Sequence, residues 1–360
     1  MTKIHLVNVG ENNGGDLLMA RAAISALSER LGSASVSLNG RILIHPSLIK
    51  MQGSIENRIE RRIGKQLTKL FHNNAQMFGP GDLVLDINGY RHGGIWPKLN
   101  FENDIILAKN AQRAGAYYIM CPKSFGPFDE NSKDLFRDLS QYSTKIFARD
   151  IFSFEQITKI IGTSCSLCPD YTNGFPSIKP NSTSARILSF IPNSKLVERK
   201  IFENYDLYAK HILECRDIAT KAGYRFRVLF HQRKDFEKLK FITHHSDYFY
   251  NSDPIKLKYE IGASSLVFSS RYHGMIGALS QGIPCVVLGW TEKYKGYLDN
   301  YDVGHCLLLS SAQLEEVRKA IYNISIEENY SLIVKSINKG NYNIRQKLSK
   351  MWDEVAGLVA

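Results

Sequence analysis

The sequence predicts an α/β protein made of two Rossmann-like domains, each built on a parallel sheet. Short apolar runs alternate with segments of helical periodicity through most of the chain, as crossover helices between parallel strands require. The alternation resumes after a stretch rich in Pro, Ser and Asn at residues 176–184, which suits neither helix nor strand. The length, 360 residues, also exceeds the size at which one hydrophobic core usually keeps growing.

In the first half we expect four strands, at residues 4–9, 83–87, 117–121 and 144–148. A helix should follow the first strand, because apolar residues recur there at spacings of three and four and so share one face. These are Leu17, Ala20, Ile24, Leu27 and Leu31.

The second half repeats this pattern. We expect strands at 186–191, 225–230, 266–269 and 285–288, separated by helices at about 203–222, 254–263 and 272–281. The predicted domains are therefore residues 1–178 and 185–326, and residues 327–360 should form one or two closing helices.

The composition is that of a soluble globular protein, with 44% hydrophobic and 22% charged residues, and it excludes collagen-like, disordered and coiled-coil classes. The net charge of +11 favours an anionic partner, whether nucleic acid, a phosphorylated metabolite or an acidic membrane face. The sequence shows neither a signal peptide nor an apolar run long enough to span a membrane. We therefore expect a cytoplasmic protein, at most peripheral at the inner membrane face.

Six cysteines are too few and too scattered for a disulfide scaffold. Cys165 and Cys168 form a single C-x-x-C with no second pair and no suitably spaced His. Ordinary strand cysteines are the expected interpretation.

Ligands of such folds lie beyond the carboxyl ends of the strands, so the strand exits are the candidate sites. The first exit, residues 10–16, is a glycine-rich turn that matches neither the dinucleotide fingerprint nor the P-loop. Asp16 fits a helix cap as well as a ligand contact. The exit at residues 86–94 alternates polar side chains with glycines and carries Arg91 and His92, as a sugar or phosphate site would, although a plain surface loop is the alternative.

Two further exits follow. Residues 124–128 bend the chain sharply, and Arg149 and Asp150 end the next strand with opposite charges, which a surface ion pair would also explain. Residues 269–293 contain the highest density of candidate site residues. Arg271 and His273 lie at the amino terminus of a predicted helix, which favours anions. Lys293 follows the next predicted strand, at the same edge of the sheet. A core histidine with a structural arginine is the alternative.

At this point the sequence resembles the polysaccharide pyruvyl transferase family, in ordered motifs along most of the chain. The family's N-x-G-D loop is similar to Asn13-Gly14-Gly15-Asp16, its G-P turn to Gly126-Pro127, its R-D element to Arg149-Asp150 and its P-D element to Pro169-Asp170. Its R-x-H, G-x-P and later lysine resemble Arg271-Tyr272-His273, Gly282-Ile283-Pro284 and Lys293. One departure stands out: the family's usual triple-glycine strand exit appears here as Asn88-Gly89-Tyr90-Arg91-His92-Gly93-Gly94, which alters the expected acceptor recognition.

The resemblance implies two Rossmann-like domains whose parallel sheets face across a cleft, as in the glycosyltransferase B-type architecture. The first domain would hold the acceptor and the second the donor, phosphoenolpyruvate. The enolpyruvyl part would pass to hydroxyls of a polysaccharide or its precursor, or of a lipid-linked glycan, giving a pyruvate ketal and phosphate.

The same resemblance suggests roles for individual residues. Phosphoenolpyruvate carries a carboxylate and a phosphate, which Arg271, Lys293 and Arg149 would bind. His273 would act as general acid or protonate the departing phosphate, and Asp16 would act as base or orient a hydroxyl. The acceptor sugar would contact Asn13, Asn88, Arg91 and His92. The scheme requires no metal and no cofactor.

Three rival functions remain. A nucleotide-sugar glycosyltransferase shares the architecture, and Arg/Lys pairs also hold diphosphates. A non-catalytic membrane- or polymer-binding protein would use a basic helical stretch, although a solvated helix face explains that stretch better. Its residues are Arg58, Arg61, Arg62, Lys65 and Lys69. Nucleic-acid binding ranks last, because no RRM, KH or zinc-finger pattern is present.

Overall fold

The computed structural model describes residues 2–10, 13–32, 34–38, 41–43, 78–94, 96–180, 186–244, 247–289, 292–309 and 314–359. The basic stretch predicted to approach a membrane, Arg58, Arg61, Arg62, Lys65 and Lys69, lies outside these residues, as do residues 181–184 of the predicted domain boundary. Within the described part of the chain, no helix combines the length and apolarity that crossing a membrane requires.

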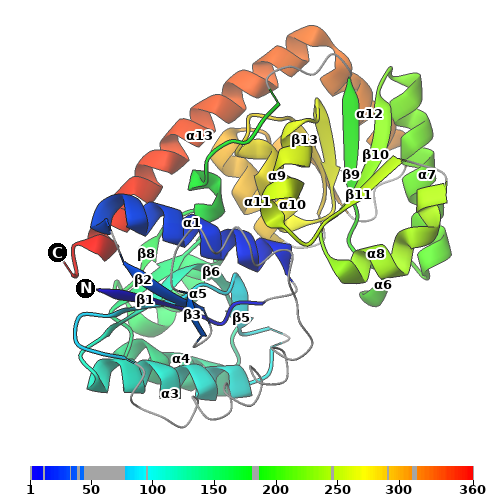
Figure 1. The fold of residues 1–360 in the computed structure, drawn as a ribbon. Coiled ribbons are helices and arrows are strands. Elements are labelled where there is room, and N and C mark those ends of the chain that lie inside the picture. Colours follow the sequence, from blue (N-terminus) through cyan, green and yellow to red (C-terminus); the bar gives the residue numbers. More distant parts are fainter. Residues whose placement is uncertain are drawn as a thin grey trace. The chain divides into compact units, whose positions relative to one another are not determined.

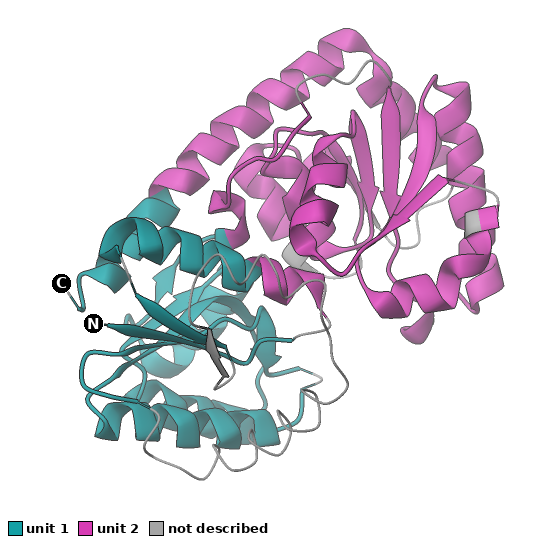
Figure 2. Cartoon of the chain, in the orientation of Figure 1, with its two compact units in different colours: residues 1–11, 19–171, 347–360 teal, residues 12–18, 172–346 magenta. Residues whose placement is uncertain are grey.

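The chain forms two compact units, shown in Figure 2. Unit 1 contains residues 1–11, 19–171 and 347–360, and unit 2 contains residues 12–18 and 172–346. The sequence-based boundaries were contiguous along the chain, whereas this grouping by contacts assigns the start of the first helix to unit 2 and the last residues to unit 1.

Unit 1 is built on an eight-stranded sheet in the order β3-β2-β1-β4-β6-β7-β8, with β5 paired to β6 (Figure 1). Its strands are β1 (Lys3–Val7), β2 (Ser35–Leu38), β3 (Arg41–Leu43), β4 (Leu83–Asp86), β5 (Tyr90–His92), β6 (Tyr117–Phe125), β7 (Lys145–Ala148) and β8 (Ser166–Leu167). Every pairing is parallel except that of β2 with β3.

The helices of unit 1 cover this sheet with apolar faces. They are α1 (Gly14–Leu31, whose first residues belong to unit 2), α3 (Leu99–Arg113), α4 (Glu130–Gln141) and α5 (Ile151–Ile161), followed by the 3-10 turn η2 (Tyr171–Gly174), which begins the passage to unit 2. Phe101 of α3, Phe136 of α4 and Ile157 of α5 join one core with Val84 and Met120 of the strands. The face predicted for α1 is correct in part: Ala20, Ile24 and Leu27 are buried, but Leu17 and Leu31 are only half-buried. Burial also extends beyond that face to four further residues, Leu18, Met19, Ala22 and Ala23.

Strand β6 extends beyond the predicted end at residue 121. It continues to Phe125 because its pairing with β7 shifts register between Met120 and Lys123, around Pro122. A proline has no N–H to donate to the ladder, so an irregularity at this point is expected. The extension carries Lys123 and Ser124 to the carboxyl edge of the sheet.

Unit 2 contains a six-stranded sheet, all parallel, in the order β11-β10-β9-β12-β13-β14. Its strands are β9 (Ile187–Ile191), β10 (Arg225–Phe230), β11 (Asp247–Tyr250), β12 (Leu266–Ser269), β13 (Cys285–Gly289) and β14 (Leu307–Leu309). Buried apolar side chains fill the central strands, as in sheets covered on both faces.

The helices of unit 2 are α6 (Lys195–Glu198), α7 (Tyr205–Lys221), α8 (Arg233–Leu239), α9 (Pro254–Gly262), α10 (Tyr272–Leu279), α11 (Glu292–Leu298), α12 (Leu314–Ser325) and α13 (Glu327–Ala356). Among them, α7, α9 and α10 match the three helices predicted between the strands of this unit, and α6, α8, α11 and α12 were not predicted. Short 3-10 turns are η3 (Lys240–His244), η4 (Asp299–Tyr301) and η5 (Gly304–Cys306). The predicted closing segment is a single long helix, α13, whose last turns belong to unit 1. There Trp352 packs edge-on against Tyr171, and Asp353 pairs with Arg30 at 2.8 Å.

Short polar side chains start several of these helices. Asp129 of α4, Asp150 of α5, Asn204 of α7 and Asp253 of α9 each accept a hydrogen bond from a backbone N–H in the first turn. Such a cap satisfies a donor that the helix itself leaves unpaired. Asp129, Asp150 and Asp253 each lie between a strand and the helix that follows it. These caps therefore help to fix the backbone at the strand exits, where the candidate sites lie.

The described cysteines are ordinary. All six are free thiols, and Cys165 and Cys168 flank the two-residue strand β8. Burial raises the pKa of the Cys168 thiol to about 12, so it carries little thiolate at neutral pH.

Candidate functional site

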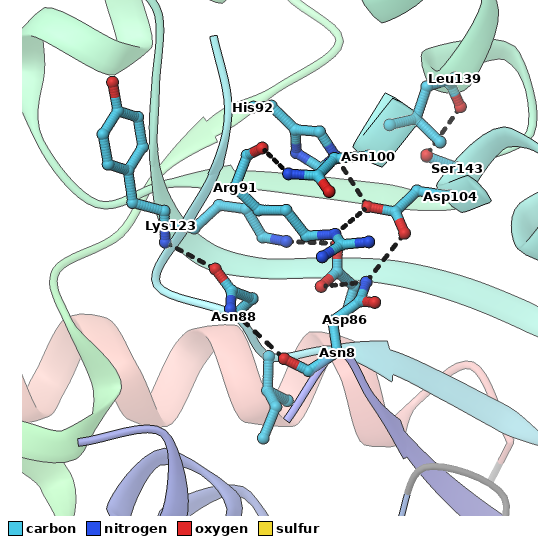
Figure 3. A network of polar contacts seen from close by, with 12 residues as sticks. Asn8, Asp86, Asn88, Arg91, His92, Asn100, Asp104, Lys123, Leu139 and Ser143 are labelled. Carbon is cyan, nitrogen blue, oxygen red and sulfur yellow. Dashed lines mark hydrogen bonds and ion pairs between the residues drawn. The ribbon is translucent and has the colours of Figure 1, made fainter. Parts of the chain in front are cut away.

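A buried polar network lies at the carboxyl edge of the sheet in unit 1 (Figure 3). We call it the Asp86 network; its members are Asn8, Asp86, Arg91, His92, Asp104 and Lys123. The Lys123 ammonium pairs with Asp86, and both side chains are fully buried. The second carboxylate of the network, that of Asp104, accepts hydrogen bonds from His92 Nε2 at 2.8 Å and from Arg91 Nε at 3.0 Å.

Asn8 joins the two carboxylates of this network. Its Nδ2 lies 3.0 Å from an oxygen of Asp86 and 3.0 Å from an oxygen of Asp104. Asn8 has φ of 61°, a left-handed conformation that asparagine tolerates better than most residues. The turn after β1 therefore aims an amide between two buried acids.

The charges of the network balance. Two carboxylates face one ammonium and one guanidinium, while burial lowers the pKa of His92 in spite of the hydrogen bond and charge of Asp104. The pKa of Asp104 is also lowered: burial, the largest single influence, would raise it, but the hydrogen bond from His92 and the positive charges of Arg91 and Lys123 help to outweigh burial. At neutral pH, His92 is therefore a neutral donor to Asp104.

The network also contains three groups with the chemistry of metal ligands. One ligand atom each from Asp86, His92 and Asp104 lies within 4.8 Å of the others, an arrangement that their spacing along the chain did not indicate. Lys123 and Arg91 already supply positive charge to these two acids. A metal ion would have to replace the ammonium.

A second cluster in unit 1 surrounds Arg149, which is 5% exposed. Its Nη1 lies 3.0 Å from Asp170, and its Nε donates to Ser124 Oγ at 2.9 Å. Asp150 instead accepts from Ser124 Oγ and caps α5 through the N–H of Ser153. The surface ion pair considered for Arg149 and Asp150 is therefore wrong, because both are buried with other partners. The arginine of the R-D motif pairs with the aspartate of the P-D motif.

Gly89 explains why the loop before β5 can pass this cluster. A Cβ on Gly89 would lie 3.0 Å from Arg149 Nη1. Asn88 shapes the same loop, donating to the Asn8 carbonyl at 3.3 Å and accepting from the N–H of Tyr90 at 3.0 Å.

In unit 2, the amino termini of two helices meet around His273. We call this the Arg271 site; its members are residues 13–15, His231, Gln232, Asp235, Arg271 and His273. Gly15 lies in the first turn of α1, and a Cβ there would be 2.2 Å from His273 Nδ1. The main chain of α1 can approach the imidazole only because residue 15 has no side chain.

Neighbouring strand exits complete the Arg271 site. Asn13 Oδ1 accepts from Gln232 Nε2 at 2.9 Å and from the N–H of Gly15 at 3.1 Å. His231 follows β10, and burial, with the nearby His273 and Arg271, lowers its pKa to about 3. His231 is therefore neutral across the physiological pH range.

Arg271 is the N-cap residue of α10, and its side chain makes no capping hydrogen bond. Arg271 as a whole is 8% exposed; its Nη2 pairs with the fully buried Asp235, and its Nε lies 3.4 Å from the Pro192 carbonyl. A cation at an uncapped helix amino terminus is suited to an anion.

The structure distributes the predicted site residues between the two units. Asn88, Arg91, His92 and Arg149 belong to unit 1, whereas Asn13, Asp16, Arg271, His273 and Lys293 belong to unit 2. Asp16 is buried in the first turn of α1. Lys293 is the second residue of α11, and its side chain lies outside the described part of the structure. His92 is fully buried and faces Asp104, so it offers no exposed surface to an acceptor.

Sequence reasoning did not select several members of these sites. His231 and Gln232 directly follow a correctly predicted strand, so the strand-exit argument would have found them. Lys123 precedes the G-P turn, but its position in a buried strand became visible only in the structure. Asp104 and Asp235 lie on helices, where charged residues are usually solvated, but their helical spacing from the buried residues Ala108 and Leu239 could have indicated that both are buried.

The fold is that of a known class of two-domain α/β proteins. Among solved structures, the chain is similar to the Staphylococcus aureus MnaA–UDP complex, with 12% identity, a TM-score of 0.57, and coverage of 98% of this chain and 95% of that one. A UDP-GlcNAc 2-epimerase from Neisseria meningitidis bound to UDP-GlcNAc gives 13% identity, a TM-score of 0.54 and 99% coverage of both chains. Anabaena Alr3699/HepE in complex with UDP gives 11% identity, a TM-score of 0.52, and coverage of 98% and 100%. At these identities the likeness shows the fold alone, and it confirms the predicted class of two parallel-sheet domains of the glycosyltransferase B type.

The family is shown by the sequence itself. The family model for polysaccharide pyruvyl transferase matches residues 13–292, from the glycine-rich start of α1 to the start of α11. The chain belongs to the polysaccharide pyruvyl transferase family and is a transferase. Among curated proteins, no sequence match was found.

Proposed function

We propose that the protein transfers the enolpyruvyl group of phosphoenolpyruvate to two hydroxyls of a polysaccharide or its precursor, forming a pyruvate ketal and releasing phosphate. The observation that carries this proposal is the Arg271 site, where Arg271 and His273 stand at the amino terminus of α10 and the start of α1 meets the imidazole. Arginine and helix amino termini favour a phosphate or a carboxylate, and this donor has both.

The reaction assigns a role to each group. Protonation of the methylene carbon makes C2 electrophilic, and one sugar hydroxyl adds there. A second hydroxyl then displaces phosphate by breaking the C2–O bond, so one hydroxyl proton balances the new methyl group and the other leaves with phosphate. His273 would supply the proton to carbon or to the departing phosphate, and Asp16 would accept a hydroxyl proton or orient the hydroxyl.

The remaining predicted contacts divide between donor and acceptor. Arg271, Lys293 and Arg149 would bind the donor, and Asn13, Asn88 and Arg91 would contact the acceptor. The burial of His92 supports an indirect role, in which it holds Asp104 and through it Arg91. The acceptor would be a sugar of a polysaccharide or a lipid-linked glycan.

The direct test is to incubate the protein with phosphoenolpyruvate and a panel of glycans and lipid-linked sugars, following phosphate release and product mass together. A product heavier by one ketal-linked pyruvate, formed in step with phosphate, is the expected result. His273→Ala should lose most turnover while keeping its unfolding temperature; full activity of this folded variant would exclude His273 as the acid.

A nucleotide-sugar glycosyltransferase is the second candidate, because solved structures of this fold are bound to UDP or UDP-GlcNAc. Thermal-shift titration separates the two, since a ligand stabilises the state that binds it. Stabilisation by phosphoenolpyruvate and not by nucleotide sugars is expected, and the reverse pattern would favour the glycosyltransferase.

A further inference from the structure

Asp235 is a fully buried carboxylate with no role in the proposed reaction. It lies in the first turn of α8, on a different element from the arginine that it contacts. Its Oδ1 accepts from the backbone N–H of Ser194 at 2.9 Å and also pairs with Nη2 of Arg271. One oxygen atom therefore links α8, the exit of β9 and the exit of β12.

The contacts of Arg271 leave one side of its guanidinium available. Nη2 faces Asp235 and Nε faces the Pro192 carbonyl, and Nη1 makes no hydrogen bond within the part of the chain that the structure describes. The two protein contacts fix the plane of the fork. Nη1 is then the nitrogen that a ligand would use.

We infer that Asp235 is a positioning residue that holds the Arg271 guanidinium in the orientation needed to bind the anionic donor. The inference rests on the proposed function for the identity of that donor, but the hold of Asp235 on Arg271 is a property of the site alone. A long arginine side chain loses considerable rotamer freedom when a ligand fixes it. Asp235 and the Pro192 carbonyl restrict it before the donor arrives, which strengthens binding by preorganisation.

The second oxygen of Asp235 makes a discriminating variant possible. Oδ2 is buried and has no hydrogen-bond partner among the described residues, while Oδ1 makes both contacts. In Asp235→Asn, the amide oxygen can stay at the Oδ1 position and the NH2 group can take the Oδ2 position. This variant keeps both acceptor contacts and removes the charge, whereas Asp235→Ala removes the contacts as well.

The first experiment measures the hold on Arg271 without any donor. The wild type, Asp235→Asn, Asp235→Ala and the control Glu237→Gln are labelled with phenylglyoxal, and modification of Arg271 is quantified by peptide mass spectrometry. Glu237 lies on the same helix in an exposed pair with Arg233. We expect Asp235→Ala to label Arg271 at least about fivefold faster than wild type, with Asp235→Asn and the control near wild type. Equal labelling of Asp235→Ala and wild type would overturn the inference.

The second experiment separates binding from turnover. Asp235→Ala should raise the KM for phosphoenolpyruvate by about tenfold or more, with a smaller change in kcat, and Asp235→Asn should restore most of the affinity. A loss confined to kcat, or an Asn variant as impaired as the folded Ala variant, would contradict a positioning role. Should Asp235→Ala not fold, Asp235→Glu, which moves the carboxylate by one methylene, should show the same rise in KM.

The two experiments fail in different ways. A wild type that neither binds phosphoenolpyruvate nor releases phosphate from it, with Arg271 still exposed in Asp235→Ala, refutes the proposed function and leaves the role of Asp235 intact. A wild type that is active, with Asp235→Ala unchanged in both labelling and KM, refutes the role of Asp235 alone.

Discussion

Replacing Lys123 with methionine should strongly destabilise unit 1. Methionine keeps most of the length and volume of the lysine stem, so the change removes the ammonium without creating a large cavity. Lys123 and Asp86 are both fully buried, and breaking such a pair from one side typically costs about 3–5 kcal/mol. Asp86 would keep the amide of Asn8 at 3.0 Å and the hydroxyl of Tyr118 at 3.3 Å. Because these neutral donors still solvate the carboxylate, we expect a loss near the lower limit, about 3 kcal/mol.

The assay is urea unfolding at neutral pH, followed by tryptophan fluorescence. Two of the three tryptophans, Trp96 and Trp352, belong to unit 1 and Trp290 belongs to unit 2, so the measurement uses a Trp290→Phe background in which the signal reports on the unit that contains the pair. Lys133→Met is the matched control, because Lys133 makes an exposed pair with Glu130 on α4, and exposed pairs contribute only about 0–1 kcal/mol. Adding Asp86→Asn to Lys123→Met should recover part of the lost stability, since the stranded charge is then gone.

The same variant tests the metal-ligand geometry of the network. With the ammonium removed, Asp86, His92 and Asp104 keep ligand atoms within 4.8 Å of one another. Zn²⁺ or Mn²⁺ should therefore raise the unfolding temperature of Lys123→Met more than that of wild type.

In the urea experiment, a destabilisation of Lys123→Met no greater than that of Lys133→Met would refute the argument that Lys123 compensates buried negative charge.

Two further predictions concern single residues elsewhere in the molecule. Gly15→Ala should lower kcat of the proposed transfer by about tenfold or more while changing the unfolding temperature little, because the added Cβ would sit 2.2 Å from His273 Nδ1 and displace the imidazole. The control is Gly296→Ala, because a Cβ at residue 296 meets nothing within 4 Å. Equal kcat values for the two variants would contradict the close approach of residue 15 to His273. Burial lowers the pKa of His211 to about 4, so the unfolded chain binds a proton below pH 6.5 that the folded chain excludes, and stability is lost as the pH falls from about 6.5 to about 4. Between pH 7 and pH 5, His211 should lower the free energy of unfolding by about 2 kcal/mol. In urea unfolding, His211→Leu should therefore lose about 2 kcal/mol less stability than the wild type over this pH range. An unchanged pH dependence would exclude His211 as its source.

Eight strands and their exits were predictable because they depend on local patterns. Six strands in the described part of the chain, of two to four residues each, were missed, and in these the apolar run is short: β2, β3, β5, β8, β11 and β14. Buried parallel strands appear as short apolar runs, and the loops after them carry glycine and polar residues, so Arg271 and His273 could be placed at the start of a helix from the sequence alone. The same logic explains why residues 10–16 and 86–94 were recognised as candidate sites. Part of the buried face of α1 also followed from its spacing, at Ala20, Ile24 and Leu27.

The partners of these residues were not predictable, because they come from elements distant in the chain. Asp235 lies 36 residues before Arg271, and Asp104 reaches His92 from the face of α3 that also buries Phe101. Helical periodicity can place an acid on a buried face, but it does not say which cation that acid will meet, because this depends on what packs against the helix. Asp150 shows the same limit: it caps α5 and accepts from Ser124 Oγ, while Arg149 forms an ion pair with Asp170.

The sequence by itself thus determined the fold class, eight of the strands, the family and the exits that carry the chemistry, because backbone geometry and burial periodicity are local. Only the tertiary structure decided which charge pairs with which. A buried ion needs a counter-ion close to it in space, and that counter-ion usually comes from a distant part of the sequence. Three contacts therefore form only when the chain folds: Gly15 packs closely on His273, Arg149 pairs with Asp170, and Arg271 pairs with Asp235.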